Sequence, residues 1–249
     1  MTGAPAPSPA ALLDRMRDEV RRSGCTFVNG EATKLLLTSE SIESWDAFAE
    51  SWNDLGADTY MADGGGYRRR RHAVFQLRRG VLLRREHQPH FQSRDYNPLN
   101  GGVQRWFEPI GATVGASILL RDLVVACGRL IAELEPGQEN VHRIEVHQFR
   151  IEPHADEEAF PTPEGMHRDG VDWVCVILIK RLNVSGGTTR VADMTGKEIQ
   201  ALLLANELDL VFLNDRCLAH AVAPIRRMDP RRPGFRDALV ITLVAHRRE

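Results

Sequence analysis

The chain has 249 residues, of which 43% are hydrophobic and 27% are charged, and its formal net charge is -2 at pH 7. This composition is typical of a soluble globular domain with a sizeable core, and it excludes a disordered or membrane-embedded chain. A chain so close to neutral has no overall attraction to nucleic acid or acidic lipid, so we expect neither as a partner. The four cysteines are scattered without a CxxC pair, which indicates neither a zinc site nor a disulfide framework.

The first ten residues, MTGAPAPSPA, are dominated by proline and alanine, and we expect this N-terminus to be flexible. It lacks the basic start and apolar core of a signal peptide, and no later run is apolar for the length of a spanning helix. The sequence therefore predicts a cytoplasmic protein.

Helical spacing of apolar residues predicts three helices in the first half of the chain, with a turn and short hairpin between the second and the third. The helices cover residues 11–24, 39–56 and 117–137, and the hairpin covers residues 64–86. Gly24 is a stop signal for the first helix, and Ser39 is a candidate cap for the second. Pro136 and Gly137 end the third.

From residue 141 onward the chain consists of short β-branched and aromatic runs separated by turn residues. The runs are VHRIEVHQFRI, DWVCVILIKRL, GGTTRVAD, LDLVFLND, CLAHAVAPI and FRDALVITLVAH. Short strands with little helix between them favour antiparallel sheets. We predict a mostly β fold with flanking helices, whose core is a cupin-like jelly roll, or double-stranded β-helix. A single domain would span residues 11–249, with helices and hairpin over about 11–140 and the jelly-roll core over about 141–249.

A single residue separates His167 from Asp169, and the pair comes directly before the apolar run DWVCVILIKRL. Residues i and i+2 of an extended chain point to the same face, so both side chains can bind one metal ion. A second such pair, His154 and Asp156, lies in the acidic, proline-broken stretch EPHADEEAFPTPEG, where we interpret it as solvated surface charge.

A third metal ligand has to come from another strand, and His220 lies in the extended run NDRCLAHAVAP. Two imidazoles and one carboxylate leave three octahedral positions open, which is the arrangement that non-haem iron(II) oxygenases use for cosubstrate and dioxygen. The alternative for His220 is a core histidine whose polar atoms are satisfied.

A 2-oxoglutarate at the open positions would need a cation for its distal carboxylate, and the planar fork of an arginine fits best. Arg236 stands at the head of RDALVITLVAH, where alternation puts it on one face with Ala238, Val240 and Thr242. The alternative is an Arg236 paired at the surface, with Arg226 or Arg227 in its place.

The HxD pair, the later histidine and the C-terminal arginine resemble the iron(II)/2-oxoglutarate-dependent dioxygenase superfamily. The segments EVHQFRI, PTPEGMHRDGVDWV, GGTTRV and LNDRCLAHAVAPI resemble a bacterial subgroup that includes L-isoleucine 4-hydroxylase and related free amino acid hydroxylases. The resemblance covers about Arg68 to His246. It implies that His167, Asp169 and His220 hold Fe(II) and that Arg236 holds 2-oxoglutarate.

The same resemblance implies that the enzyme hydroxylates an unactivated C–H of a small molecule, above all a free L-amino acid. Dioxygen would be consumed, succinate and CO2 released, and ascorbate would be a supporting reductant. The carboxylate of Asp169 favours hydroxylation, because a related halogenase would have a small residue there. Gln148, Arg150 and Trp173 are candidates for substrate or cosubstrate contacts, and a homodimer is a candidate assembly.

Two other functions fit the sequence. A cupin-like sensor would hold a metal without oxidising anything, and it would be indifferent to Arg236→Ala. A macromolecule-directed hydroxylase would dock through Arg68 to Arg71, although such a run is more often solvated or paired with carboxylates. A protein-kinase interpretation of HRD fails, because HRDGVDWV lacks the asparagine that follows the aspartate in kinases.

Overall fold

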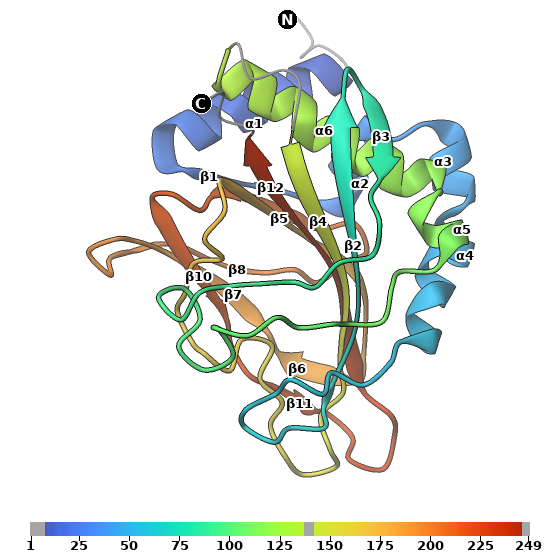
Figure 1. Cartoon of the computed structure of the whole chain (residues 1–249), viewed down its shortest axis with the longest axis vertical. Helices are drawn as coiled ribbons and strands as arrows, with labels where there is room; N and C mark the ends of the chain where they lie inside the picture. The colour runs from blue at the N-terminus through green and yellow to red at the C-terminus, as the bar shows by residue number, and fades with distance from the viewer. Residues whose placement is uncertain (1–7, 137–141, 246–249) are drawn as a thin grey trace, which may run out of the picture.

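The computed structural model describes residues 8–136 and 142–245, and its centre is made of antiparallel strands (Figure 1). One sheet has seven strands in the order β1-β9-β5-β12-β4-β2-β3, and two smaller sheets have the orders β10-β7-β8 and β11-β6. The large sheet contains β1 (Cys25–Val28), β2 (Arg68–Arg78), β3 (Val81–Arg84), β4 (His142–Ile151), β5 (Trp173–Leu182), β9 (Leu210–Asn214) and β12 (Phe235–Ala245). The smaller sheets contain β6 (Val184–Gly186), β7 (Thr188–Asp193), β8 (Glu198–Leu203), β10 (Leu218–Val222) and β11 (Ile225–Arg227).

The six runs predicted as strands form β4, β5, β7, β9, β10 and β12, and the predicted hairpin forms β2 and β3. The mostly β fold with flanking helices is therefore confirmed. The hairpin also extends the same sheet as β4, because β2 pairs with β4 along ten residues of register. The short strands β1, β6, β8 and β11 were not predicted.

Helices cover one face of the seven-stranded sheet (Figure 1). They are α1 (Pro9–Ser23), α2 (Gly30–Thr33), α3 (Ser39–Glu43), α4 (Trp45–Glu50), α5 (Ala112–Gly115) and α6 (Ile118–Leu134), with the 3-10 turns η1 (Lys34–Leu36) and η2 (Ser51–Asp54). No helix within residues 8–136 or 142–245 is long and apolar enough to cross a membrane.

Helix α1 begins at Pro9, with the Ser8 hydroxyl as its N-cap, and therefore starts inside the segment expected to be flexible. It ends as predicted at Gly24, whose φ of 80° is left-handed and favours glycine. Residues 1–7 lie outside the described residues, and so does the predicted stop at Gly137.

The single helix predicted over residues 39–56 is wrong, because the structure has α3, α4 and η2 there. The hydroxyl of Ser44 donates to the carbonyl of Ser41 at the break, and such bonds compete with the helical ladder. Thr38 caps α3 in place of Ser39. The hydroxyls of Thr38 and Ser41 both donate to Asp122 on α6, which fastens this segment to the long helix.

Alternation along the central strands separates two apolar layers. On β5, Cys175 and Ile177 belong to the layer under the helices, whereas Val174 and Val176 face the smaller sheets. The second layer joins β5 and β9 to residues of β7 and β10, so the two sets of strands pack face to face as a jelly roll requires.

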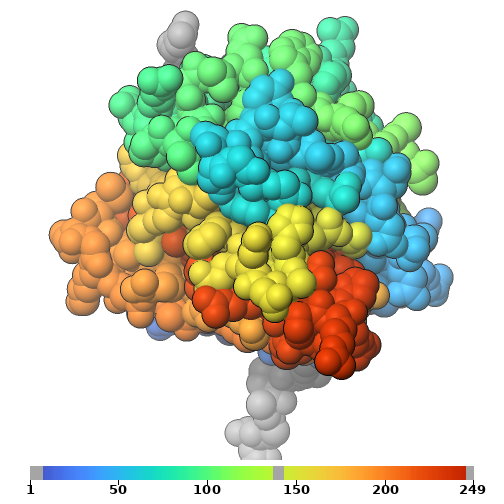
Figure 2. Space-filling model, turned by 90° about the horizontal axis from the view of Figure 1, so that it is seen from below, coloured from blue at the N-terminus to red at the C-terminus, as the bar shows by residue number. Residues whose placement is uncertain are grey.

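A third apolar cluster closes one end of the barrel. It joins residues from five segments: Tyr67, Ile151, Ala159, Val184 and Ile225. Figure 2 shows the corresponding cyan, yellow and orange-red segments side by side over this end. The first residues of β12 lie at the same end, as Figure 1 shows, so this cover buries the position of Arg236.

Candidate active site

His167 and His220 face each other across an isolated antiparallel bridge. The N–H of each donates to the carbonyl of the other, at 3.0 Å and 2.8 Å, and the ring centroids are 4.6 Å apart. His220 belongs to β10, where Val191 of β7 is its register partner. The fold thus brings together the two histidines that the sequence selected from distant segments.

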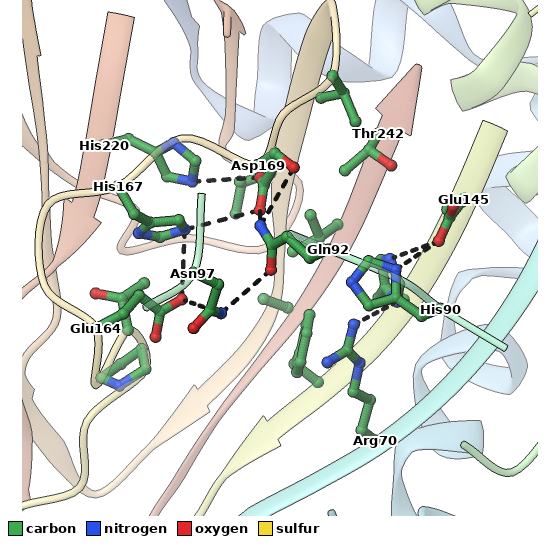
Figure 3. A pocket seen from close by; sticks show the side chains of 18 of the residues that line it. Arg70, His90, Gln92, Asn97, Glu145, Glu164, His167, Asp169, His220 and Thr242 are labelled. Carbon is green, nitrogen blue, oxygen red and sulfur yellow. Dashed lines mark hydrogen bonds and ion pairs between the residues drawn. The ribbon is translucent and has the colours of Figure 1, made fainter. Parts of the chain in front are cut away.

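Asp169 completes the triad (Figure 3). Its Oδ1 is 3.7 Å from Nε2 of His167, and its Oδ2 is 3.7 Å from Nε2 of His220. Nδ1 of His167 bonds to the carbonyl of Gly165 at 2.9 Å, which leaves Nε2 directed at the carboxylate. The three donor atoms lie within 4.8 Å of one another, and they can converge on one metal ion.

Asp215 holds the loop that carries Asp169. Its carboxylate accepts the backbone N–H groups of Asp169, Gly170 and Val171, at 2.9, 2.8 and 3.0 Å. Burial and the charge of Asp169 raise the pKa of Asp215 to about 6, against the effect of these three donors. Asp215 was not among the site residues predicted from the sequence; its place at the end of the predicted strand LDLVFLND was the only signal.

With both imidazoles neutral, as metal binding requires, the triad carries the single negative charge of Asp169, which a bound cation would balance. Burial opposes a charge on His167, but the hydrogen bond and charge of Asp169, with the charge of Glu164, raise its pKa to about 9. Burial and the charge of His167 lower the pKa of His220 to about 4. His167 therefore carries a proton that a divalent metal ion at Nε2 would displace.

The triad opens on a cavity of about 310 Å³, which suits a small molecule. The predicted alternation on β12 is present: Arg236, Ala238, Val240 and Thr242 all line this cavity. Arg236 is 3% exposed, and its Nε and Nη2 atoms have no hydrogen-bond partner among the described residues. A buried guanidinium with free donors is a site for an anion.

The family follows from comparison with known proteins. A family model described as 2OG-Fe dioxygenase matches residues 49–242. The chain belongs to this family. The curated 3(1)-hydroxy-L-isoleucine 4-dioxygenase of Pantoea ananatis (strain AJ13355) is 25% identical over an alignment of 230 residues that covers 89% of this chain and 92% of that protein.

Solved structures agree with this family assignment. The crystal structure of a bsmA homologue from Methylobium petroleophilum PM1 is 34% identical, with a TM-score of 0.84 over 98% of this dioxygenase and 95% of that chain. IDO from Bacillus thuringiensis is 18% identical, with a TM-score of 0.78 over 94% of this chain and 100% of that chain. The double-stranded β-helix predicted from the sequence is confirmed by these neighbours.

The other arginines considered for 2-oxoglutarate lie elsewhere in the dioxygenase. Arg226 is exposed and pairs with Glu158 at 2.9 Å, and Arg227 is not part of the cavity lining. The second His-x-Asp pair, His154 and Asp156, is exposed, as predicted from the sequence.

Three residues proposed as substrate contacts require correction, because none of them lines the cavity. Gln148 donates to the hydroxyl of Ser51, on the helical side of the sheet. Arg150 forms a bidentate pair with Asp237, and Trp173 stacks on Phe212 in the core.

The face of β4 that does line the cavity carries Glu145, His147 and Phe149. Gln148 and Arg150, which were predicted as contacts, lie on the opposite face of β4. Both faces of this strand carry polar side chains, so the sequence alone does not show which one lines the cavity. The neighbouring strand β2 sends Arg68 and Arg70 inward, while Arg69 and Arg71 pair outward with Glu152 and Asp54. The arginine run is therefore no exposed docking patch.

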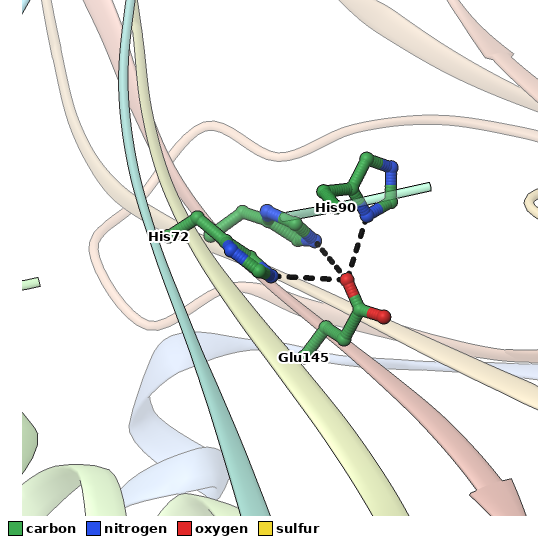
Figure 4. A group of neighbouring side chains, drawn as sticks. His72, His90 and Glu145 are labelled. Carbon is green, nitrogen blue, oxygen red and sulfur yellow. Dashed lines mark hydrogen bonds and ion pairs between the residues drawn. The ribbon is translucent and has the colours of Figure 1, made fainter. Parts of the chain in front are cut away.

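A second group of metal-type donors, His72, His90, Glu145 and His147, lies at the wall of the cavity (Figure 4). Oε2 of Glu145 is hydrogen-bonded by His72 at 3.0 Å and by His90 at 2.6 Å. Arg70 bonds to Nδ1 of His147 at 2.9 Å. The carboxylate of Glu145 already has two imidazole partners, and the positive charge of Arg70 lies next to His147. This group therefore suits a metal ion less well than the triad does.

Arg150→Met is expected to lower the free energy of unfolding by about 3 kcal/mol, because it leaves the buried carboxylate of Asp237 without its cation. Urea unfolding measures this loss. The double variant Arg150→Met/Asp237→Leu should regain most of it, since both charges are removed together. A single variant as stable as wild type but unable to use substrate would instead support the contact role proposed from the sequence.

Acid should destabilise the dioxygenase through His90. Burial lowers the pKa of His90 from 6.5 to about 4, so below pH 6.5 the unfolded chain binds a proton that the folded chain does not. Stability from this source is complete above pH 6.5 and falls as the pH is lowered toward about 4. Unfolding by urea at several pH values should show a smaller loss in His90→Gln than in wild type, and no such change in the exposed control His154→Gln.

Proposed function

We propose that this dioxygenase hydroxylates an unactivated C–H bond of a free L-amino acid and converts 2-oxoglutarate to succinate and CO2. The observation that carries the proposal is a two-histidine, one-carboxylate triad that shares a small cavity with the unpartnered guanidinium of Arg236. The named activity of the Pantoea ananatis relative, on a hydroxylated isoleucine, supports an amino acid as substrate.

The donor set fits Fe(II). His167, Asp169 and His220 would hold the ion on one face, and Arg236 would grip the distal carboxylate of 2-oxoglutarate through Nε and Nη2. The bound iron and 2-oxoglutarate supply the dioxygen activation that hydroxylation requires. Fixed side chains would orient both: Asp215 holds the loop of Asp169, and Arg236 is buried where it lines the cavity.

The rival functions have less support. Arg68 and Arg70 are buried, so they are not part of an exposed docking surface of the kind that a macromolecule-directed hydroxylase would need. A metal-holding sensor would not need a free cation at Arg236. The carboxylate of Asp169, rather than a small side chain, favours hydroxylation over halogenation.

The test is incubation of the protein with Fe(II), 2-oxoglutarate, ascorbate, air and a pool of L-amino acids, followed by mass spectrometry. We expect succinate and an amino acid that has gained one oxygen atom. Succinate without an oxygenated amino acid would refute the substrate class and leave the dioxygenase. Bound iron with no succinate under any condition would favour the sensor.

His167→Ala and His220→Ala should each reduce succinate formation to background, because two of the three ligands do not hold Fe(II) in place. Iron retained after anaerobic dialysis should fall with activity. His154→Ala, in the exposed second His-x-Asp pair, is the control and should resemble wild type. Undiminished succinate formation by His220→Ala would contradict the assignment of the iron ligands.

Arg236→Ala should raise the KM for 2-oxoglutarate by about 10- to 100-fold, which corresponds to one lost charge-assisted hydrogen-bonded contact. Arg236→Lys, which keeps the charge without the fork, should have an intermediate effect. Arg226→Ala is the matched control, since that arginine pairs at the surface. An unchanged KM in Arg236→Ala would show that another group binds the cosubstrate.

A further inference from the structure

A free amino acid brings an α-carboxylate and an α-ammonium group into the cavity, and each needs a partner of opposite charge. Several charged side chains line the cavity besides the triad and Arg236. The hydrogen bonds and ion pairs of these side chains show which of them already have a partner and which have atoms without one.

Most of these charges are already satisfied. Arg68 pairs with Asp58 at 2.7 Å, and Arg143 pairs with Oε1 of Glu145 at 3.1 Å. The other oxygen of Glu145 accepts from His72 and His90. None of these groups has a charge left over for a substrate.

Arg105 is different. It is 2% exposed, and its Nη2 donates only to the neutral side-chain oxygen of Gln92, at 3.2 Å. Its Nε atom has no partner within the described part of the chain. Burial and the charge of Arg68 lower the pKa of Arg105, against the charges of Asp58, Glu164 and Asp169, which raise it.

Arg70 adds to this positive excess. Its guanidinium lies over the rings of Phe107 and Phe149, at 3.9 Å and 4.5 Å from their centroids, and its Nη1 is 4.0 Å from the carboxylate that Arg68 occupies. Arg68 and Arg70 thus share the single carboxylate of Asp58, and the charge of Arg68 is unfavourable for that of Arg105. An anion beside Arg105 would relieve this imbalance.

Glu164 is the complementary acid. Its side chain is 9% exposed, and Oε2 has no hydrogen-bond partner among residues 8–136 and 142–245. Oε1 has only long contacts, 3.5 Å to Nδ2 of Asn97 and 3.5 Å to Nε2 of His167. Once that nitrogen of His167 binds iron it is no longer a donor to Glu164, which leaves Oε1 with the long contact to Asn97 and Oε2 without a partner in the described part of the chain.

We infer that Arg105 binds the α-carboxylate of the substrate and Glu164 its α-ammonium group, which makes the cavity a receptor for an amino acid zwitterion. The inference rests on the proposed function and names the residues that select its substrate class. Gln92 connects the receptor to the iron site, because it accepts from Arg105 and donates to Oδ1 of Asp169 at 3.3 Å (Figure 3).

The test compares three substrates in the intact enzyme: the amino acid oxidised in the pooled assay, its carboxamide and its des-amino acid. Arg105→Gln should raise the KM for the amino acid by about 10- to 100-fold and change the KM for the carboxamide little, because the carboxamide lacks the anion. Glu164→Gln should raise the KM for the amino acid by a similar factor and change the KM for the des-amino acid little, because the des-amino acid lacks the ammonium group. The matched controls Arg226→Gln and Glu158→Gln, in an exposed ion pair outside the cavity lining, should keep the wild-type preference among the three substrates.

Loss of packing alone would lower kcat/KM for all three substrates by the same factor, and that result would overturn the inference. If Arg105→Gln does not fold, Arg105→Lys should show a smaller loss confined to substrates with a carboxylate, and equal losses for acid and amide would again overturn it. Wild-type enzyme that oxidises the carboxamide and the des-amino acid as well as the amino acid would also refute the receptor.

Anaerobic binding of 2-oxoglutarate to the Fe(II) enzyme, read by visible absorption, separates this inference from the proposed function. If that complex forms but no free amino acid is bound or oxidised, the zwitterion receptor is wrong and the dioxygenase remains. If the complex does not form, the proposed function fails and the receptor fails with it.

Discussion

The interior of this barrel contains many charged side chains, and each buried charge is unfavourable unless it has a partner. Partners from within the chain satisfy some of them, such as Arg150 with Asp237 and Arg68 with Asp58. Others, among them Arg236, Arg105 and Glu164, line one cavity with atoms that have no hydrogen-bond partner in the described part of the chain. The pair of Arg150 and Asp237 joins register partners of β4 and β12, whereas the unsatisfied groups are the basis for the ligands that we propose for the cavity.

Polar residues around the triad hold one of its members, Asp169, in place. Asp215 accepts three consecutive backbone N–H groups and so fixes the turn that presents Asp169. Gln92 reaches the same carboxylate from the other side of the cavity. Because Gln92 also bonds to Arg105, a substrate carboxylate bound there, as we propose, would be joined through Gln92 to the proposed iron ligand Asp169.

The sequence was informative where a strand's two-residue period decides the answer. Alternation predicted that His167 and Asp169 share a face and that Arg236, Ala238, Val240 and Thr242 line one surface, and the structure has both arrangements. The same rule could not decide β4, because Gln148 and Arg150 on one face are as polar as Glu145 and His147 on the other.

The remaining site residues depend on tertiary contacts that no local pattern contains. Arg105 and Glu164 lie outside the regular strands, and their buried atoms without a hydrogen-bond partner are recognisable only in the folded chain. The single helix predicted over residues 39–56 is broken where the Ser44 hydroxyl donates to the carbonyl of Ser41, and the hydroxyls of Thr38 and Ser41 fasten its first piece to Asp122 on α6.

The measurement that tests the central claim most directly is the reaction under dioxygen labelled with ¹⁸O, in the presence of Fe(II), 2-oxoglutarate and the pool of L-amino acids. The account predicts one labelled oxygen atom in succinate and one in a hydroxylated amino acid, formed together. Labelled succinate with no labelled amino acid would contradict the proposed substrate class, and the absence of label from succinate would contradict 2-oxoglutarate-dependent oxygenation itself.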